Sequence, residues 1–79
     1  QVSTPVDELN AKELNILIER TLKELPDKAR EIFKMNRFQG LKYTEIADKL
    51  SIYVKTVEAN MGKALKIFRR NLNEFLKVI

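Results

Sequence analysis

The sequence predicts an all-α protein: a small four-helix domain that contains a helix-turn-helix and lacks winged elements. Apolar residues recur at helical spacing along most of the chain, whereas a period-two strand pattern never persists for more than a few residues. Both prolines and one of the two glycines fall where a helix can begin or end. The length of 79 residues suits one domain, which we take as residues 1–79.

The first helix is expected within residues 1–24, where Thr4 is a suitable N-cap and Pro5 suits the first helical position. Pro26 has the same role at the start of a second helix over residues 26–39. Residues that should face the core share helical spacing in each segment. They are Leu14, Leu17, Ile18, Leu22 and Leu25 in the first helix, and Ala29, Ile32, Phe33 and Met35 in the second.

Residues 44–77 have the pattern of a helix-turn-helix with a long recognition helix. Gly40 can end the preceding helix in the left-handed conformation, and Thr44 is the expected N-cap of a short third helix. That helix stops near Leu50, and residues 51–53 form the turn before the fourth helix. This geometry would insert the start of the fourth helix into the DNA major groove.

The fourth helix has two chemically different sides. At 100° per residue, the side expected to pack on the core comprises Val57, Met61, Ala64, Leu65, Phe68, Leu72 and Phe75. The opposite side comprises Lys55, Ala59, Gly62, Lys63, Lys66 and Arg70. A glycine inside a helix costs about 1 kcal/mol relative to alanine, so Gly62 indicates a face that another surface approaches closely. Further core residues expected in the helix-turn-helix are Ile46, Leu50 and Ile52.

Positive charge is concentrated in the second half of the chain. Residues 1–41 hold seven basic and seven acidic side chains, whereas residues 42–79 hold eight basic and four acidic ones. The whole net charge of +4 therefore lies in the half that contains the predicted helix-turn-helix. Such asymmetry favours a polyanionic partner, although a solvated helix face has the same composition.

The composition argues against several classes of function. Because the chain has no Cys and no His, it lacks the usual nucleophiles, general bases and metal ligands, so we expect no enzymatic activity and no cofactors. No signal peptide or apolar run long enough for a bilayer is present, which favours a cytoplasmic protein without membrane insertion. The chain starts with Gln rather than Met, and we expect it to be a C-terminal fragment of a longer protein.

The stretch from Leu25 to Leu72 resembles region 4 of a bacterial sigma-70 family factor of the extracytoplasmic-function type. The residues that carry this resemblance are Leu25-Pro26, Arg30, Phe33, Gly40, Tyr43, Glu45-Ile46-Ala47, Val54-Lys55-Thr56-Val57-Glu58 and Lys63-Ala64-Leu65. The run from Met61 to Leu65 is similar to the branch of the family that is expanded in the Bacteroides group. The resemblance implies binding to the promoter −35 element, docking on the β flap of RNA polymerase core, and inhibition by an anti-sigma factor.

On this interpretation, Lys42 and Thr44 lie where the third helix crosses the phosphate backbone, and the start of the fourth helix meets base edges. Glu58 has no partner four residues away and can accept a hydrogen bond from cytosine. Tyr53 either stacks on the DNA backbone or covers the core, and Thr56 is either a surface hydroxyl or a phosphate contact. The candidate DNA-binding residues are Lys42, Thr44, Tyr53, Val54, Lys55, Thr56, Glu58, Ala59, Asn60, Lys63 and Lys66.

Two residues of the turn depart from the family pattern. Ser51 stands where Gly is usual, and Tyr53 stands where Ser usually caps the recognition helix. Ala59 and Asn60 also replace polar residues that are commoner in the family, so the resemblance does not imply a particular −35 sequence. Two alternatives remain at this point: a LuxR-type DNA-binding domain of a response regulator, which shares a similar core, and a helical module that binds only proteins.

Overall fold

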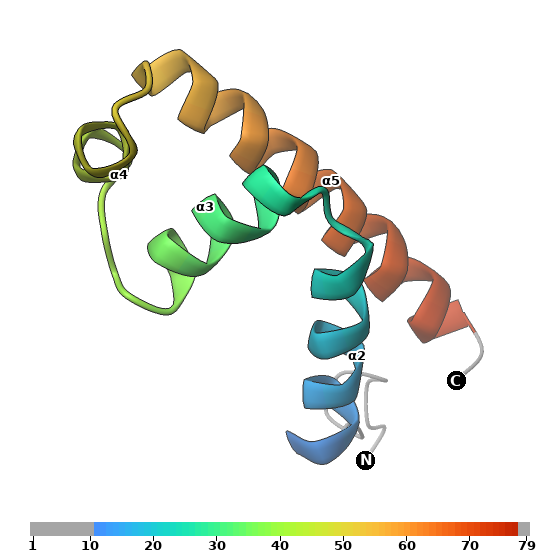
Figure 1. Cartoon of the computed structure of the whole chain (residues 1–79). Coiled ribbons are helices and arrows are strands. Elements are labelled where there is room, and N and C mark those ends of the chain that lie inside the picture. Colours follow the sequence, from blue (N-terminus) through green and yellow to red (C-terminus); the bar gives the residue numbers. More distant parts are fainter. Residues whose placement is uncertain (1–10, 78–79) are drawn as a thin grey trace, which may run out of the picture.

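The computed structural model describes residues 11–77, which form four helices and no strand (Figure 1). The helices are α2 (Ala11–Glu24), α3 (Asp27–Arg37), α4 (Tyr43–Leu50) and α5 (Val54–Lys77). This confirms the predicted all-α, four-helix class. The expected start of the first helix at Thr4 and Pro5 lies outside the described residues.

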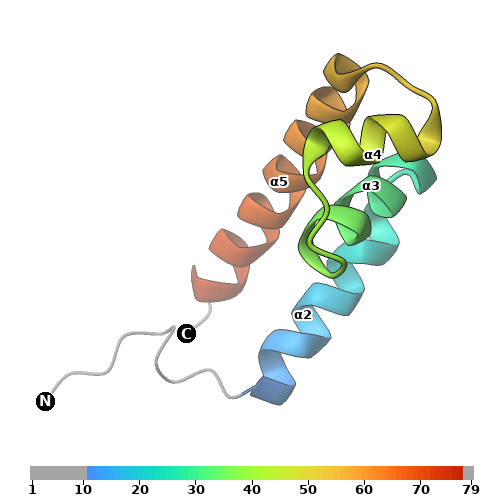
Figure 2. The same ribbon diagram turned by 90° about the vertical axis from the view of Figure 1, so that its left-hand side faces the viewer.

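The long α5 helix is the element on which the other helices pack. α3 and α4 pack against it and against each other, and α2 makes a smaller contact with it. In Figures 1 and 2, α4 lies beside the N-terminal end of α5, whereas the start of α2 lies towards the C-terminal end of α5. The N-terminal half of α5 and α4 therefore form one end of the molecule, and α2 extends from the other. Within residues 11–77, no helix combines the length and the apolar character needed to cross a membrane.

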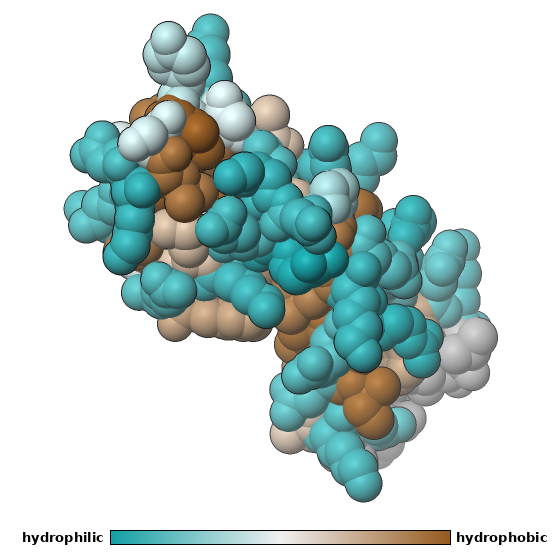
Figure 3. Space-filling model, in the orientation of Figure 1, coloured by the Kyte–Doolittle hydropathy of each residue, from teal (hydrophilic) through white to brown (hydrophobic). Residues whose placement is uncertain are grey.

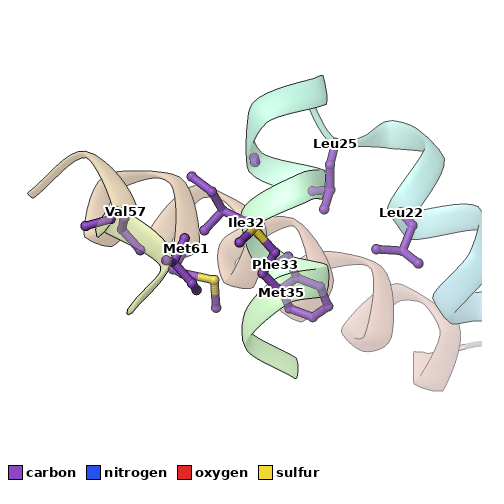
Figure 4. Close-up of a cluster of buried hydrophobic side chains, with 11 residues drawn as sticks. Leu22, Leu25, Ile32, Phe33, Met35, Val57 and Met61 are labelled. Carbon is purple, nitrogen blue, oxygen red and sulfur yellow. The ribbon is translucent and has the colours of Figure 1, made fainter. Parts of the chain in front are cut away.

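The core lies where α3, α4 and α5 meet (Figure 4). Ile32, Ile46 and Val57 have no exposed surface, and Met61 is almost as deeply buried. Burying an aliphatic side chain of this size contributes about 1.5–3 kcal/mol. The cluster comprises Leu22, Leu25, Ala29, Ile32, Phe33, Met35, Ile46, Ala47, Val57, Met61 and Ala64. The predicted inner stripe of the second helix is thus confirmed.

Several residues predicted to be in the core lie at its margin instead. Leu50, Ile52, Leu65 and Phe68 are half-buried, although they pack against the central cluster. Leu14 was also predicted to face the core, but 40% of its surface is exposed. The physical reason is the small size of the domain, which leaves few side chains fully surrounded by others.

The predicted ends of two helices are wrong by a few residues. α3 ends at Arg37 rather than residue 39, and the N–H groups of Phe38 and Gln39 both donate to the carbonyl of Lys34. Gly40 then takes the predicted left-handed conformation, at φ 73°. α4 begins at Tyr43, one residue before the expected cap, and Lys42 occupies the N-cap position.

Thr44 therefore lies in the first turn of α4 and does not cap it. The Lys42 N–H instead donates to the Glu45 carboxylate at 2.7 Å, so the acidic residue in the first turn stabilises the start of the helix. The Thr44 side chain is exposed and is not needed for the cap.

Candidate nucleic-acid interface

The turn between α4 and α5 depends on a left-handed residue. Ser51 has φ 58° and ψ 46°, and within residues 11–77 it is the one non-glycine residue with positive φ. Its N–H donates to the Ala47 and Asp48 carbonyls, and the Ile52 N–H donates to Ala47 at 3.0 Å. These bonds end α4 and reverse the chain. Ser51 thus adopts the left-handed conformation that glycine usually adopts at a helix end, and this conformation costs a non-glycine residue backbone energy.

Tyr53 precedes the recognition helix and projects into solvent. Its side chain is 84% exposed, so the possibility that it covers the core is excluded. Its backbone carbonyl accepts hydrogen bonds from the N–H groups of Thr56 at 3.0 Å and Val57 at 3.2 Å. The carbonyl of Tyr53 therefore starts the helix without a serine side chain, and the phenol ring remains available at the tip of the helix-turn-helix.

The solvent-facing side of α5 is exposed over three turns. A straight row on this side has a lysine at each end and residues with little or no side chain between them: Lys55, Ala59, Gly62 and Lys66. A Cβ atom added at Gly62 would meet nothing within 4 Å. No contact inside the described part of the chain therefore requires a glycine at this position.

The lysines on the exposed side of α5 are not paired with acidic side chains of the described residues. Lys55, Lys63 and Lys66 form no ion pair within residues 11–77, and Glu58 has none there either. Lys42 and Thr44 add exposed polar groups at the start of α4, which packs beside this part of α5. The structure thus brings a lysine and a hydroxyl from α4 to the same end of the molecule as the lysines of α5.

Two of the candidate residues have intramolecular contacts. Val54 is half-buried and packs against the central cluster, so much of its side chain serves the core. Asn60 is also half-buried, and its side-chain amide donates to the Thr56 carbonyl at 2.8 Å. Thr56 itself is exposed, as are Glu58, Ala59 and Lys63.

Arg70 was predicted on the outer face but contacts α2. Its guanidinium lies 2.8 Å from the Glu24 carboxylate, in an exposed ion pair. The reason is that α2 packs beside the C-terminal half of α5 and brings Glu24 within reach of Arg70.

Sequence reasoning missed a second surface, which is apolar. Leu14, Leu17 and Ile18 of α2 face Leu65, Phe68, Arg69 and Leu72 of α5 across a shallow cleft. An aromatic series leads away from this cleft: Phe68 stacks on Phe33 with ring centres 4.6 Å apart, and Phe33 meets Phe38 edge-on at 6.3 Å. Phe38 is 60% exposed. The face drawn in Figure 3 is largely hydrophilic, with apolar surface showing between α4 and the start of α5, near the centre of the view and over α2.

The described residues offer no sign of a metal centre. No group of three or more His, Cys, Asp or Glu side chains that could hold a metal ion occurs among residues 11–77. The chemistry available on the outer face of α5 is therefore that of ammonium groups, one carboxylate, hydroxyls and an exposed helix backbone.

Comparison with known proteins gives two matches. The family described as Sigma-70, region 4 matches residues 15–67, which is more than half of the chain. RNA polymerase sigma factor SigZ of Bacillus subtilis (strain 168) is 44% identical over 41 residues. That alignment covers 52% of this chain and 23% of the relative, so it spans less than a quarter of the longer protein.

Proposed function

Because this chain belongs to the sigma-70 region 4 family, we propose that it recognises the promoter −35 element as region 4 of an RNA polymerase sigma factor. In this function it directs transcription initiation by placing the polymerase on DNA. The extracytoplasmic-function type, which rests on the residues from Leu25 to Leu72, and the Bacteroides-like branch, which rests on Met61 to Leu65, are parts of the same proposal, as is a cytoplasmic location.

One observation carries the DNA-binding part of this proposal: the row that joins Lys55, Ala59, Gly62 and Lys66 is basic at both ends and small in the middle. Its two lysines are eleven residues apart, or about 16 Å along the helix. Because the start of the helix enters the major groove first, Lys55 lies nearest the base edges and Lys66 reaches phosphate, while the small residues between them let the helix approach the DNA closely.

The remaining candidate residues divide by the contacts they offer. Lys42 and Thr44 are placed to contact phosphate from the start of α4, and Lys63 and Lys66 do so from α5. Nearer the bases, Glu58 can accept from the amino group of cytosine, and Ala59 can contact the methyl group of thymine. The other candidate DNA-binding residues lie in the first two turns of α5 or just before it: Tyr53, Val54, Lys55, Thr56 and Asn60.

The polymerase-docking part of the proposal uses the second surface. The apolar cleft between α2 and α5, together with the exposed Phe38, offers a place for an apolar segment of the β flap. This surface lies on the flank of α5 away from the row of lysines, so DNA and polymerase can be held together. An anti-sigma factor would act by covering either surface.

Titration of duplex DNA with the chain at several salt concentrations tests the proposal. We expect a steep fall in affinity with salt and a preference for one duplex sequence. A module that binds only proteins would show no salt-dependent DNA binding. Direct binding to RNA polymerase core, measured by a pull-down with purified core enzyme, tests the polymerase-docking part of the proposal.

A further inference from the structure

α2 is joined to α5 by a short series of polar contacts, which we call the α2–α5 clasp. It consists of the side chains of Thr21, Glu24, Arg70 and Asn71. Thr21 has no exposed surface and is the one buried polar side chain within residues 11–77. Burying a polar side chain between two helices costs free energy unless the polar group is hydrogen-bonded, so a threonine at this buried position calls for a physical explanation.

The Thr21 hydroxyl and both polar groups of the Asn71 side chain have defined partners. The Thr21 hydroxyl donates to the Leu17 carbonyl at 2.8 Å, and its oxygen accepts from the Asn71 amide at 2.9 Å. The Asn71 side-chain oxygen in turn accepts from Arg70, at 3.2 and 3.3 Å. Because the threonine proton is already used on Leu17, only a donor can meet its oxygen, and this fixes the orientation of the Asn71 amide.

The clasp side chains do not line the apolar cleft themselves, but they adjoin residues of both its walls along the chain. Leu17 and Ile18, one turn before Thr21, form part of the α2 wall, and Leu72 directly follows Asn71 on the α5 wall. Apolar contacts alone do not fix how two helices slide or turn on each other, whereas directional hydrogen bonds select one arrangement. The exposed Glu24–Arg70 ion pair adds little to the stability of this arrangement, since exposed ion pairs contribute about 0–1 kcal/mol.

We propose that Thr21 and Asn71 are positioning residues for polymerase docking, because their hydrogen bond sets the separation of the two cleft walls. This inference rests on the proposed docking of RNA polymerase at the cleft. Neither residue contacts the polymerase itself in this arrangement. Their effect is to hold the cleft open in the free chain, so that less ordering is required on binding.

Matched substitutions separate this role from a general effect on folding. Asn71→Asp keeps the shape but replaces the donor with carboxylate oxygens, which face the Thr21 oxygen. Thr21→Val keeps the volume and removes the acceptor, whereas Thr21→Ser retains it. Binding of each variant to immobilised core RNA polymerase, purified free of sigma factor, is compared with its binding to duplex DNA, while hydrogen exchange of α2 and α5 amides reports the fold.

We expect Asn71→Asp and Thr21→Val to weaken polymerase binding about tenfold or more while DNA binding stays within about twofold. Thr21→Ser should restore polymerase binding to within about threefold of the unsubstituted chain. Equal polymerase binding by all variants would overturn the positioning role alone, as would a parallel loss of DNA binding. If the unsubstituted chain fails to bind polymerase, the proposed docking is wrong and this inference falls with it.

Discussion

Arg30 closes the end of α2 by donating from Nε to the carbonyl oxygen of Leu22 at 2.8 Å. The same guanidinium donates from Nη2 to the Leu25 carbonyl at 2.9 Å and from Nη1 to the Asp27 carboxylate at 3.1 Å. The last carbonyls of a helix have no partner within it. One planar side chain of α3 thus binds a carbonyl in the last turn of α2 and another just beyond its end, and so ties the two helices together.

We expect Arg30→Ala to lower the free energy of unfolding by about 1–3 kcal/mol, because charge-assisted hydrogen bonds to two carbonyls are lost. Arg30→Lys should recover only part of this, since an ammonium group cannot reproduce the fork. Chemical denaturation followed by circular dichroism measures both. The matched control is Lys28→Ala, which removes only an exposed pair with Glu31 at 3.5 Å; if it cost as much as Arg30→Ala, the assigned role of Arg30 would be wrong.

Ser51→Gly is expected to stabilise the domain. A left-handed conformation costs a non-glycine residue roughly 1–2 kcal/mol, and the greater freedom of glycine in the unfolded chain offsets roughly 0.5–1 kcal/mol of the gain. A rise of a few degrees in the melting temperature should result, whereas Asp48→Gly, inside α4, should lower it. An unchanged or lower melting temperature for Ser51→Gly would contradict the strain assigned to this turn.

Two core truncations should differ because their burial differs. Ile46 has no exposed surface, so Ile46→Ala is expected to cost about 2–5 kcal/mol and can unfold so small a domain. Leu50 is half-buried, and Leu50→Ala should cost less. Thermal melts of the two variants give the comparison. A larger loss at Leu50 would mean that the helix-turn-helix packs differently from the arrangement described.

Gly62→Ala should move stability and DNA binding in opposite directions. An added Cβ meets nothing within 4 Å, so the substitution should stabilise the helix by about 1 kcal/mol. If DNA approaches α5 at this point, the methyl group should weaken duplex binding, and Gly62→Glu should weaken it further through bulk and charge. DNA binding that improves in step with stability would argue against close approach at Gly62.

Lys66→Ala and Glu58→Ala should affect DNA binding in different ways. Losing a phosphate contact should weaken binding to all duplexes alike and reduce the salt slope by about one. Losing a base contact should cost about 1–3 kcal/mol on the preferred duplex and change which base is favoured there. Titration of single-base duplex variants separates the two effects. A uniform loss with Glu58→Ala would place it away from the bases.

The sequence by itself determined the helical class, the inner stripe of α3 and the basic outer side of α5. These properties follow from local spacing, since residues three or four apart share a face of a helix wherever that helix packs. Ser51 and Tyr53 were recognisable as departures because the resemblance to sigma-70 region 4 implies Gly and Ser at these two positions of the turn. The exact ends of the helices do not follow from local spacing. Thr44 was expected to be the N-cap of α4, but the N-cap is Lys42, whose N–H donates to the Glu45 carboxylate.

Only the tertiary structure decided which parts of each face are used. Arg70 shares its side of α5 with the free lysines, but its pairing with Glu24 depends on where α2 lies, 46 residues away in the chain. The link between Thr21 and Asn71 and the apolar cleft beside it depend on the same placement, whereas the marginal burial of Leu50 depends on how α4 packs against α3 and α5. Helical spacing fixes directions around one axis, whereas contacts between helices depend on how separate axes cross, and no local pattern encodes that angle.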